Sequence, residues 1–250
     1  MFKKFLRYFS VTQWIIWLGS LAVVTIGFAL TKQRSVLSYL SSLFGISCII
    51  FNAKGNVTGQ FIAIIFSALY AAYSYTQHYY GEMIIYLALM IPIHSFSIVS
   101  WLRNKYNGKA CEVKINTLKK TEYLYVGLGA AAVTVAFYFL LKALNTDNLI
   151  VSTISLTTSI TAAYLILRRC EYYSICFIAN DIVLIILWSM KIATDGWASL
   201  PSVLGFVTFL VIDGYCFISW RKMHKRQTKE TNEKSVETEQ PDTPPLKTEE

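Results

Sequence analysis

Three ionisable side chains fall inside long apolar runs of this sequence: His94, Asp181 and Asp213. Placing such a group at bilayer depth costs about 2.5 to 3.5 kcal/mol, so these groups usually face a bundle interior and are candidate functional residues. Asp181 lies near the middle of its run with Asn180 beside it. We expect this pair to hydrogen-bond a polar ligand, the structural alternative being a hydrogen bond to a neighbouring helix.

His94 follows Pro92, which cannot donate a backbone hydrogen bond and therefore predicts a bend in its helix. A bend beside a polar group suits a gate or a binding site, and a histidine bonded to Ser97 is the structural alternative. Asp213 occupies the equivalent place in the second half of the chain. We predict that it is a structural partner of Arg221 or of a neighbouring helix.

Aromatic residues are dense between positions 70 and 86. Tyr79, Tyr80 and Trp197 lie near run ends, where tyrosine and tryptophan usually form an interfacial belt. Tyr70 and Tyr86 lie deeper, where stacking on a planar ligand ring contributes about 0.5 to 1.5 kcal/mol. We include both in the predicted binding site, with ordinary packing as the alternative.

We expect transmembrane helices to carry these residues. Hydrophobic residues make up 54% of the chain, charged residues only 15%, and the mean hydropathy is +0.44, values that exclude an ordinary soluble domain. Eight apolar runs are long enough to cross a bilayer. They are residues 14–30, 36–52, 57–76, 82–102, 122–142, 149–167, 172–192 and 198–220.

The distribution of basic residues predicts the orientation. With both termini in the cytoplasm, 19 of the 23 lysines and arginines lie on the cytoplasmic side, as the positive-inside rule requires. The net charge of +8 is therefore explained by topology and implies no nucleic acid partner. The sequence predicts a multi-pass plasma membrane protein in contact with the lipid bilayer.

Residues 52–101 and 168–220 resemble two copies of one unit, because Trp101, Ser100 and His94 align with Trp220, Ser219 and Asp213. An even number of crossings separates the copies, so they are parallel repeats. The predicted organisation has five parts. These are an interfacial segment with an extra N-terminal helix (1–35), a first three-helix repeat (36–102), a basic cytoplasmic loop with a linker helix (103–145), a second three-helix repeat (146–222) and a disordered cytoplasmic tail (223–250).

Sequence motifs argue against catalysis. The five cysteines show no metal-ligand spacing, and there is no phosphate loop, His/Glu metal motif or nucleophile elbow. We therefore predict a passive transporter without metal or cofactor rather than an enzyme. An intramembrane hydrolase that uses the three ionisable residues, or a receptor that does not transport, remains as a remote alternative.

An ordered set of short motifs resembles the PnuC family of nicotinamide riboside (formerly nicotinamide mononucleotide) transporters. The motifs are Ala53-Lys54-Gly55, Ala68-Leu69-Tyr70, Tyr80-Gly81-Glu82, Pro92 and Trp101, then Arg168-Arg169, Asp181, Trp188 and the stretch from Tyr215 to Met223. The resemblance implies an all-α bundle of the 3+1+3 type found in SWEET sugar carriers, with one extra N-terminal helix. It also implies a homo-oligomer that imports a vitamin precursor by facilitated diffusion, which a cytosolic kinase then traps.

Several ligand-facing positions depart from the family pattern. This chain has Phe66, Tyr86 and His94 where members usually have Asn, Asn and Gln. The usual tryptophan pair before Asp181 is replaced by Ser174 and Phe177, or by Tyr173 and Cys176 one residue earlier. We therefore leave thiamine, riboflavin or a deoxynucleoside open as alternative solutes. The full predicted substrate site consists of Asp181, Asn180, His94, Tyr86, Tyr70, Phe177 and Trp188.

Overall fold

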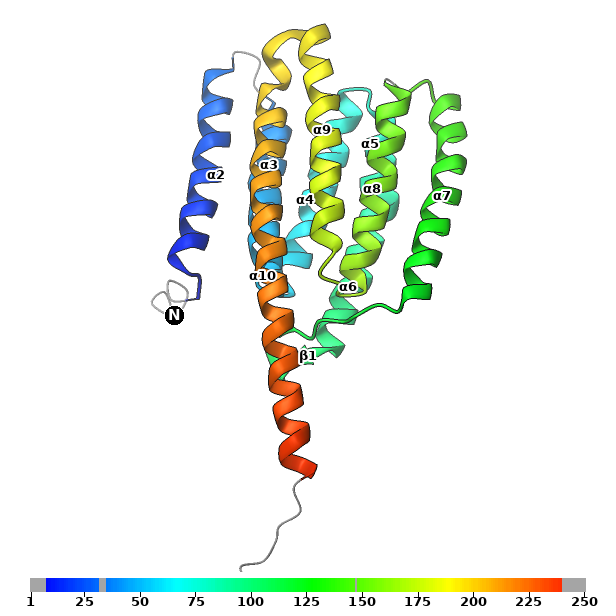
Figure 1. Cartoon of the computed structure of the whole chain (residues 1–250). Coiled ribbons are helices and arrows are strands. Elements are labelled where there is room, and N and C mark those ends of the chain that lie inside the picture. The colour runs from blue at the N-terminus through cyan, green and yellow to red at the C-terminus, as the bar shows by residue number, and fades with distance from the viewer. Residues whose placement is uncertain (1–7, 32–34, 147, 240–250) are drawn as a thin grey trace, which may run out of the picture.

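The computed structural model describes residues 8–31, 35–146 and 148–239, which form an all-α membrane protein with eight long helices (Figure 1). The fourth helix consists of the consecutive segments α5, η1 and α6, and a two-stranded hairpin precedes α7. The elements are α2 (Val11–Leu30), α3 (Val36–Asn52), α4 (Thr58–Thr76), α5 (Tyr80–Ile84), η1 (Ile85–Met90), α6 (Ile91–Arg103), β1 (Lys105–Tyr106), β2 (Lys109–Val113), α7 (Lys120–Ala143), α8 (Leu149–Leu167), α9 (Tyr173–Asp195), η2 (Gly196–Ser199) and α10 (Leu200–Glu239).

The eight helices coincide with the eight predicted spans. Among the described helices, six are long and apolar enough to cross a membrane: α2, the continuous segment from α5 to α6, α7, α8, α9 and α10. The serine-rich α3 is shorter, with 17 residues. Its Ser41 and Ser42 hydroxyls donate to the Ser38 carbonyl at 2.9 Å, so their polarity is satisfied inside the helix.

Six of the eight helices form a closed ring in the order α3, α4, α5–α6, α8, α9, α10 and back to α3. The remaining two lie outside this ring. The N-terminal α2 packs against α3 and α10, whereas α7 packs against α8 on the opposite side of the bundle (Figure 1). The chain therefore has three helices before α7 and three after it that enclose a common interior.

The two halves are tied together by a reciprocal set of hydrogen bonds, which we call the Ser-Trp clamp. Each half ends in a serine and a tryptophan whose side chains donate to the last carbonyls of the first helix of the other half. The bonds are Ser100 Oγ to Leu167 O (3.1 Å), Trp101 Nε1 to Ile166 O (3.1 Å), Ser219 Oγ to Ala53 O (2.7 Å) and Trp220 Nε1 to Asn52 O (2.8 Å). Carbonyls at helix ends lack partners within their own helix, so the clamp satisfies them.

The last helix extends far beyond the bundle, which corrects the prediction of a disordered tail from residue 223. Residues 223–239 continue α10, while 240–250 lie outside the described residues. Gln227 is only 5% exposed and contacts the segment after the hairpin, donating to Val113 O at 3.0 Å and accepting from Ile115 N at 2.9 Å. These contacts, together with a 2.6 Å hydrogen bond from Tyr106 to Glu230, stabilise a polar helix that has no apolar core of its own.

Candidate substrate-binding site

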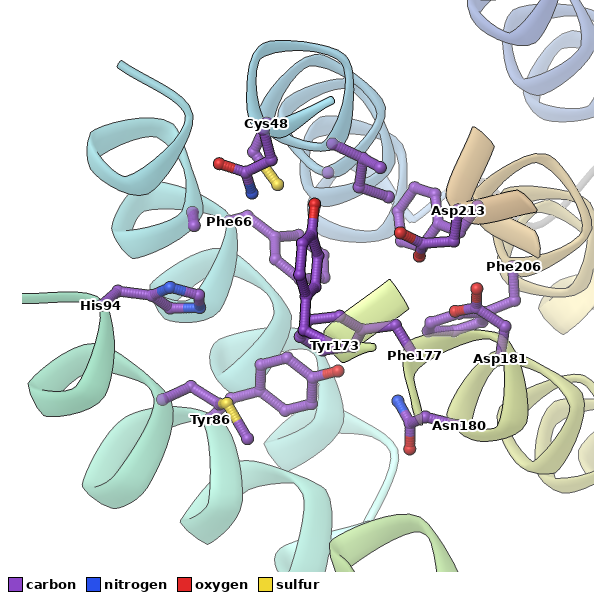
Figure 2. Close-up of a pocket in the computed structure, with 16 residues that line it drawn as sticks. Cys48, Phe66, Tyr86, His94, Tyr173, Phe177, Asn180, Asp181, Phe206 and Asp213 are labelled. Carbon is purple, nitrogen blue, oxygen red and sulfur yellow. The ribbon is translucent and has the colours of Figure 1, made fainter. Parts of the chain in front are cut away.

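A cavity lies inside the six-helix ring (Figure 2). Five helices supply its lining, and on each of them the lining residues recur at helical spacing. The residues are Gly45, Cys48, Ile49 and Asn52 of α3, Ala63 and Phe66 of α4, Tyr86, Met90 and His94 of the fourth helix, Tyr173, Phe177, Asn180 and Asp181 of α9, and Phe206, Phe209 and Asp213 of α10.

Two carboxyl groups meet on one wall of this cavity. Asp181 and Asp213 are each 3% exposed, and their side chains lie within hydrogen-bonding reach of each other (Figure 2). The Asp181 Oδ2 atom receives no hydrogen bond from any described residue. A buried acceptor without a donor is costly, so this oxygen is available to a donor on a ligand.

Asn180 is held in one orientation by the neighbouring helix. Its Oδ1 atom accepts hydrogen bonds from three α8 hydroxyls, those of Ser155 (3.2 Å), Thr158 (2.9 Å) and Ser159 (2.9 Å). The amide nitrogen therefore points the other way, toward the Tyr86 hydroxyl in the cavity (Figure 2). Asn180 thus acts as an oriented donor beside the acceptor of Asp181.

His94 is held by hydrogen bonds that lead to Gln60 and Asn52, two residues that were not predicted to belong to the site. Its Nδ1 atom lies 2.8 Å from Gln60 Oε1, and Gln60 Nε2 donates to Asn52 Oδ1 at 2.9 Å. Because the side-chain nitrogen of Gln60 donates to Asn52, the side-chain oxygen of Gln60 accepts a hydrogen bond from His94 Nδ1. The other ring nitrogen of His94, Nε2, is then left for the cavity. The alternative partner considered from sequence, Ser97, does not make this bond, and its hydroxyl has no partner in the described part of the chain.

The helix before His94 is locally widened. Residues 85–90 form a π-helical segment, in which the Ile91 N–H bonds to the Tyr86 carbonyl five residues back. Pro92 follows immediately and cannot donate a hydrogen bond, so the regular ladder is interrupted where the sequence predicts a bend. Tyr86 and Met90 of this segment both line the cavity. Such π-helical segments are frequent at functional sites.

The structure places five of the seven predicted site residues around the cavity and two elsewhere. Asp181, Asn180, His94, Tyr86 and Phe177 line it. Tyr70 and Trp188 do not, and instead bond to each other, with Trp188 Nε1 donating to Tyr70 OH at 2.9 Å.

Trp188 also stacks on Tyr73 with ring centroids 4.9 Å apart. Tyr70 lines a second, smaller pocket together with serines of α3 and with Ser202.

Aromatic rings separate the two pockets. Phe66, Phe206 and Phe209 line both of them, and Phe209 lies 5.7 Å from Phe66 and 5.4 Å from Phe206 between ring centroids. At the other end of the cavity, the Tyr173 ring packs edge-on against Trp220 of the Ser-Trp clamp at 4.9 Å. The central cavity thus has an aromatic barrier toward each end of the bundle.

Asp213 is a cavity residue that was left out of the predicted site. Of its two predicted partners, Arg221 is wrong, because Arg221 lies 3.8 Å from Glu171. The other, a neighbouring helix, agrees with the structure, since Asp213 faces Asp181 of α9. The sequence pattern could have revealed this cavity residue. Phe206, Phe209 and Asp213 recur at positions i, i+3 and i+7, which places them on one face of α10. On α9, the residues that face the cavity are Tyr173 and Phe177, one residue from each of the two registers considered from sequence.

A ring of transmembrane helices around a central cavity with oriented polar groups is typical of membrane carriers that hold a substrate near mid-membrane. The class of protein defined by this fold and site is therefore a multi-pass transporter. Residues 35–222 match the family described as nicotinamide mononucleotide transporter, and the chain belongs to that family. This confirms the resemblance seen in the sequence and assigns the protein to transporters, not enzymes.

Individual relatives agree with this assignment. The nicotinamide riboside transporter PnuC of Neisseria mucosa is 28% identical over 225 residues, which cover 88% of this chain and 84% of that protein. The nicotinamide riboside transporter PnuC of Haemophilus influenzae is 23% identical over 216 residues, covering 85% and 91%. The crystal structure of the vitamin B3 transporter PnuC matches this fold with a TM-score of 0.78 at 26% identity, covering 88% of this chain and 94% of that one.

Proposed function

We propose that this protein imports nicotinamide riboside through the central cavity. The observation that carries the proposal is the combination of an oriented donor, an open carboxylate acceptor and aromatic walls in one enclosed space. Two relatives described as nicotinamide riboside transporters support the choice of solute.

The chemistry of nicotinamide riboside complements these groups. Ribose hydroxyls can donate to Asp181 Oδ2, and the carboxamide oxygen can accept from the Asn180 amide. The pyridinium ring carries a positive charge, which the adjacent carboxyls of Asp181 and Asp213 balance and which the faces of Tyr86 and Phe66 attract.

Transport is proposed to be facilitated diffusion, with a cytosolic kinase that phosphorylates the imported nucleoside and traps it. The sequence contains no phosphate-binding loop for an ATP-driven cycle. Uptake should therefore persist after the proton gradient is collapsed. The kinase acts as a functional partner that removes the product and maintains the concentration gradient.

In the plasma membrane, both termini and the β1–β2 hairpin are proposed to face the cytoplasm, because 19 of 23 basic residues then lie on that side. A homo-oligomer is proposed as the assembled form. The outlying α7 packs mainly against α8 and leaves its other faces for lipid or for a second copy.

The function is tested with purified protein reconstituted into liposomes. We expect saturable uptake of radiolabelled nicotinamide riboside down its gradient, unchanged by an uncoupler. Protein-free liposomes are the control. Uptake that requires an imposed proton gradient would contradict facilitated diffusion, and absence of saturable uptake together with absence of binding would contradict the proposed solute.

A different vitamin or nucleoside is the second candidate, because the departures from the family pattern concentrate in the cavity. Phe66, Tyr86, His94 and Phe177 all line it. Unlabelled thiamine, riboflavin and a deoxynucleoside should therefore be added as competitors in the same uptake assay. Stronger competition by one of them than by nicotinamide riboside would select that solute.

A further inference from the structure

Glu82 is a fully buried carboxyl group that does not belong to the lining of the central cavity. It lies in the first turn of α5 and is 0% exposed. Neither of its carboxylate oxygens has a hydrogen-bond partner among the described residues. The Ser155 hydroxyl faces Glu82 but donates to Asn180 Oδ1 at 3.2 Å. Carboxyl groups inside a membrane bundle almost always pair with another group, so we expect the partner of Glu82 to come from a bound solute.

Glu82 lies in line with residues of the central cavity. Four residues of the fourth helix recur at intervals of four: Glu82, Tyr86, Met90 and His94. The last three line the cavity. Because four residues make about one helical turn, Glu82 extends the cavity-facing side of this helix by one turn. Figure 1 shows that α5, which carries Glu82, lies at the end of the bundle opposite the hairpin.

Two tyrosines connect Glu82 to both pockets of the bundle. Tyr70 and Tyr86 lie close enough to Glu82 for electrostatic interaction, and their rings pack edge to face with centroids 4.5 Å apart. Tyr70 lines the second pocket, whereas Tyr86 lines the central cavity. A carboxylate attracts a cation directly, and the face of a tyrosine ring attracts it through cation–π interaction. This group of side chains therefore suits an organic cation with a planar ring.

We propose that Glu82 binds the cationic ring of the solute at an outer position, between the central cavity and the end of the bundle opposite the hairpin. The inference rests on the proposed function, because the cation is the pyridinium ring of nicotinamide riboside. Glu82 supplies the counter-charge when the helices open on this side. The solute then passes from the carboxyl of Glu82 to that of Asp181, so its positive charge stays balanced along the route.

A structural role for Glu82 is the alternative, in which the protonated acid donates a hydrogen bond to a neighbouring helix. The two roles predict opposite orders for two substitutions. Glutamine keeps the size and the hydrogen-bonding capacity of Glu82 but has no charge, whereas aspartate keeps the charge on a shorter side chain. A counter-charge is therefore replaced better by aspartate, and a structural hydrogen bond is replaced better by glutamine.

The test reconstitutes the full chain into liposomes and compares the KM for uptake of radiolabelled nicotinamide riboside. We expect the KM to rise about tenfold in Glu82→Gln, which loses one charge-assisted contact, and less than about threefold in Glu82→Asp. The Tm of Glu82→Gln should stay within about 2 °C of wild type, because Glu82 has no described partner to lose. A larger rise of KM in Glu82→Asp than in Glu82→Gln, an unchanged KM in Glu82→Gln, or a Glu82→Gln protein that does not fold would overturn the proposal.

Glu171→Gln is the matched control. Glu171 is also a buried glutamate, but it contacts Arg221 and His224 at the hairpin end of the bundle. Its replacement should change the KM less than about twofold, and a rise equal to that in Glu82→Gln would contradict the outer position. A wild type without saturable uptake would contradict the proposed function and the outer position together, whereas uptake by wild type with no change in Glu82→Gln would contradict the outer position alone.

Discussion

Asn180 and Asp181 are neighbours in the sequence but present opposite hydrogen-bonding character to the cavity. The Asn180 oxygen is occupied by three hydroxyls of α8, so its nitrogen donates. The Asp181 Oδ2 atom receives no donor within the described structure, so it accepts. We propose that a ligand with both a carbonyl and hydroxyl groups satisfies the two residues together and that this pairing sets the specificity of the site.

This division of roles predicts the effect of two substitutions. Asn180→Ala removes the donor and should weaken nicotinamide riboside binding about tenfold, since one hydrogen bond contributes about 0.5 to 1.5 kcal/mol. Ser159→Ala removes only one of three bonds that orient the amide and should change affinity less than about twofold. Titration calorimetry on both purified variants checks this. Equal losses of affinity would show that the α8 contacts, and not a ligand contact, account for the effect.

Among the helices, the Ser-Trp clamp explains why both three-helix repeats end in the same dipeptide, Ser-Trp. Each tryptophan donates to a helix-end carbonyl of the other half, and the Trp101 and Trp220 rings lie 5.7 Å apart. We expect that substrate release toward the hairpin side separates α3, α6, α8 and α10 here, because the clamp bonds join these helices. The clamp is therefore the set of contacts that must break when the cavity opens to that side.

Loosening the clamp should expose the cavity. Trp220→Phe removes one of its bonds, about 1 kcal/mol, and should increase the population open toward the hairpin about fivefold. The readout is alkylation of Cys48, a cavity residue, by a membrane-impermeant maleimide in a variant whose other cysteines are replaced by serine.

Labelling should be faster only when the reagent is added on the hairpin side. The matched control is Trp197→Phe, since Trp197 is 71% exposed and remote from the clamp. An unchanged labelling rate in Trp220→Phe would contradict the role of the clamp.

Element positions could be predicted from sequence to the extent that burial in lipid determines them. Apolar runs long enough to span a bilayer coincide with all eight helices, because hydrocarbon requires continuous helix whatever the neighbours are. The helical continuation to Glu239 could not be predicted, since its polar composition is typical of disorder. Its stability comes from Gln227 and its contacts with Val113 and Ile115, more than 110 residues earlier in the chain.

The site was predictable where an ionisable residue stands out against an apolar run. Asp181 and His94 carry that signal, whereas the cavity residues Phe206 and Phe209 resemble any other apolar residue of a span. The hydrogen-bond partners of the site residues could not be predicted either. The hydrogen bond between His94 and Gln60, for example, joins residues 34 positions apart on different helices. A single sequence contains no information on such pairs.

For the whole molecule, we expect an even number of crossings to place Val11, Glu239 and the β1–β2 hairpin on one side of the membrane. A reporter that is active only in the cytoplasm should function when fused after Glu239 or inserted after Gly108, and should be inactive when inserted after Gln77. Gly108 lies in the hairpin turn, where a side chain would meet no atom within 4 Å, so we expect the fold to accommodate an insertion after it. Activity at all three positions would contradict this topology.

We propose that the cavity inside the six-helix ring binds nicotinamide riboside through Asp181. The most direct test measures ligand affinity and melting temperature on purified wild type and Asp181→Ala. A charge-assisted hydrogen bond contributes about 1.5 to 3 kcal/mol, so we predict that affinity falls by about one to two orders of magnitude while the Tm changes little. A lowered Tm with unchanged affinity would show that Asp181 holds helices together, and would contradict its assignment to the substrate.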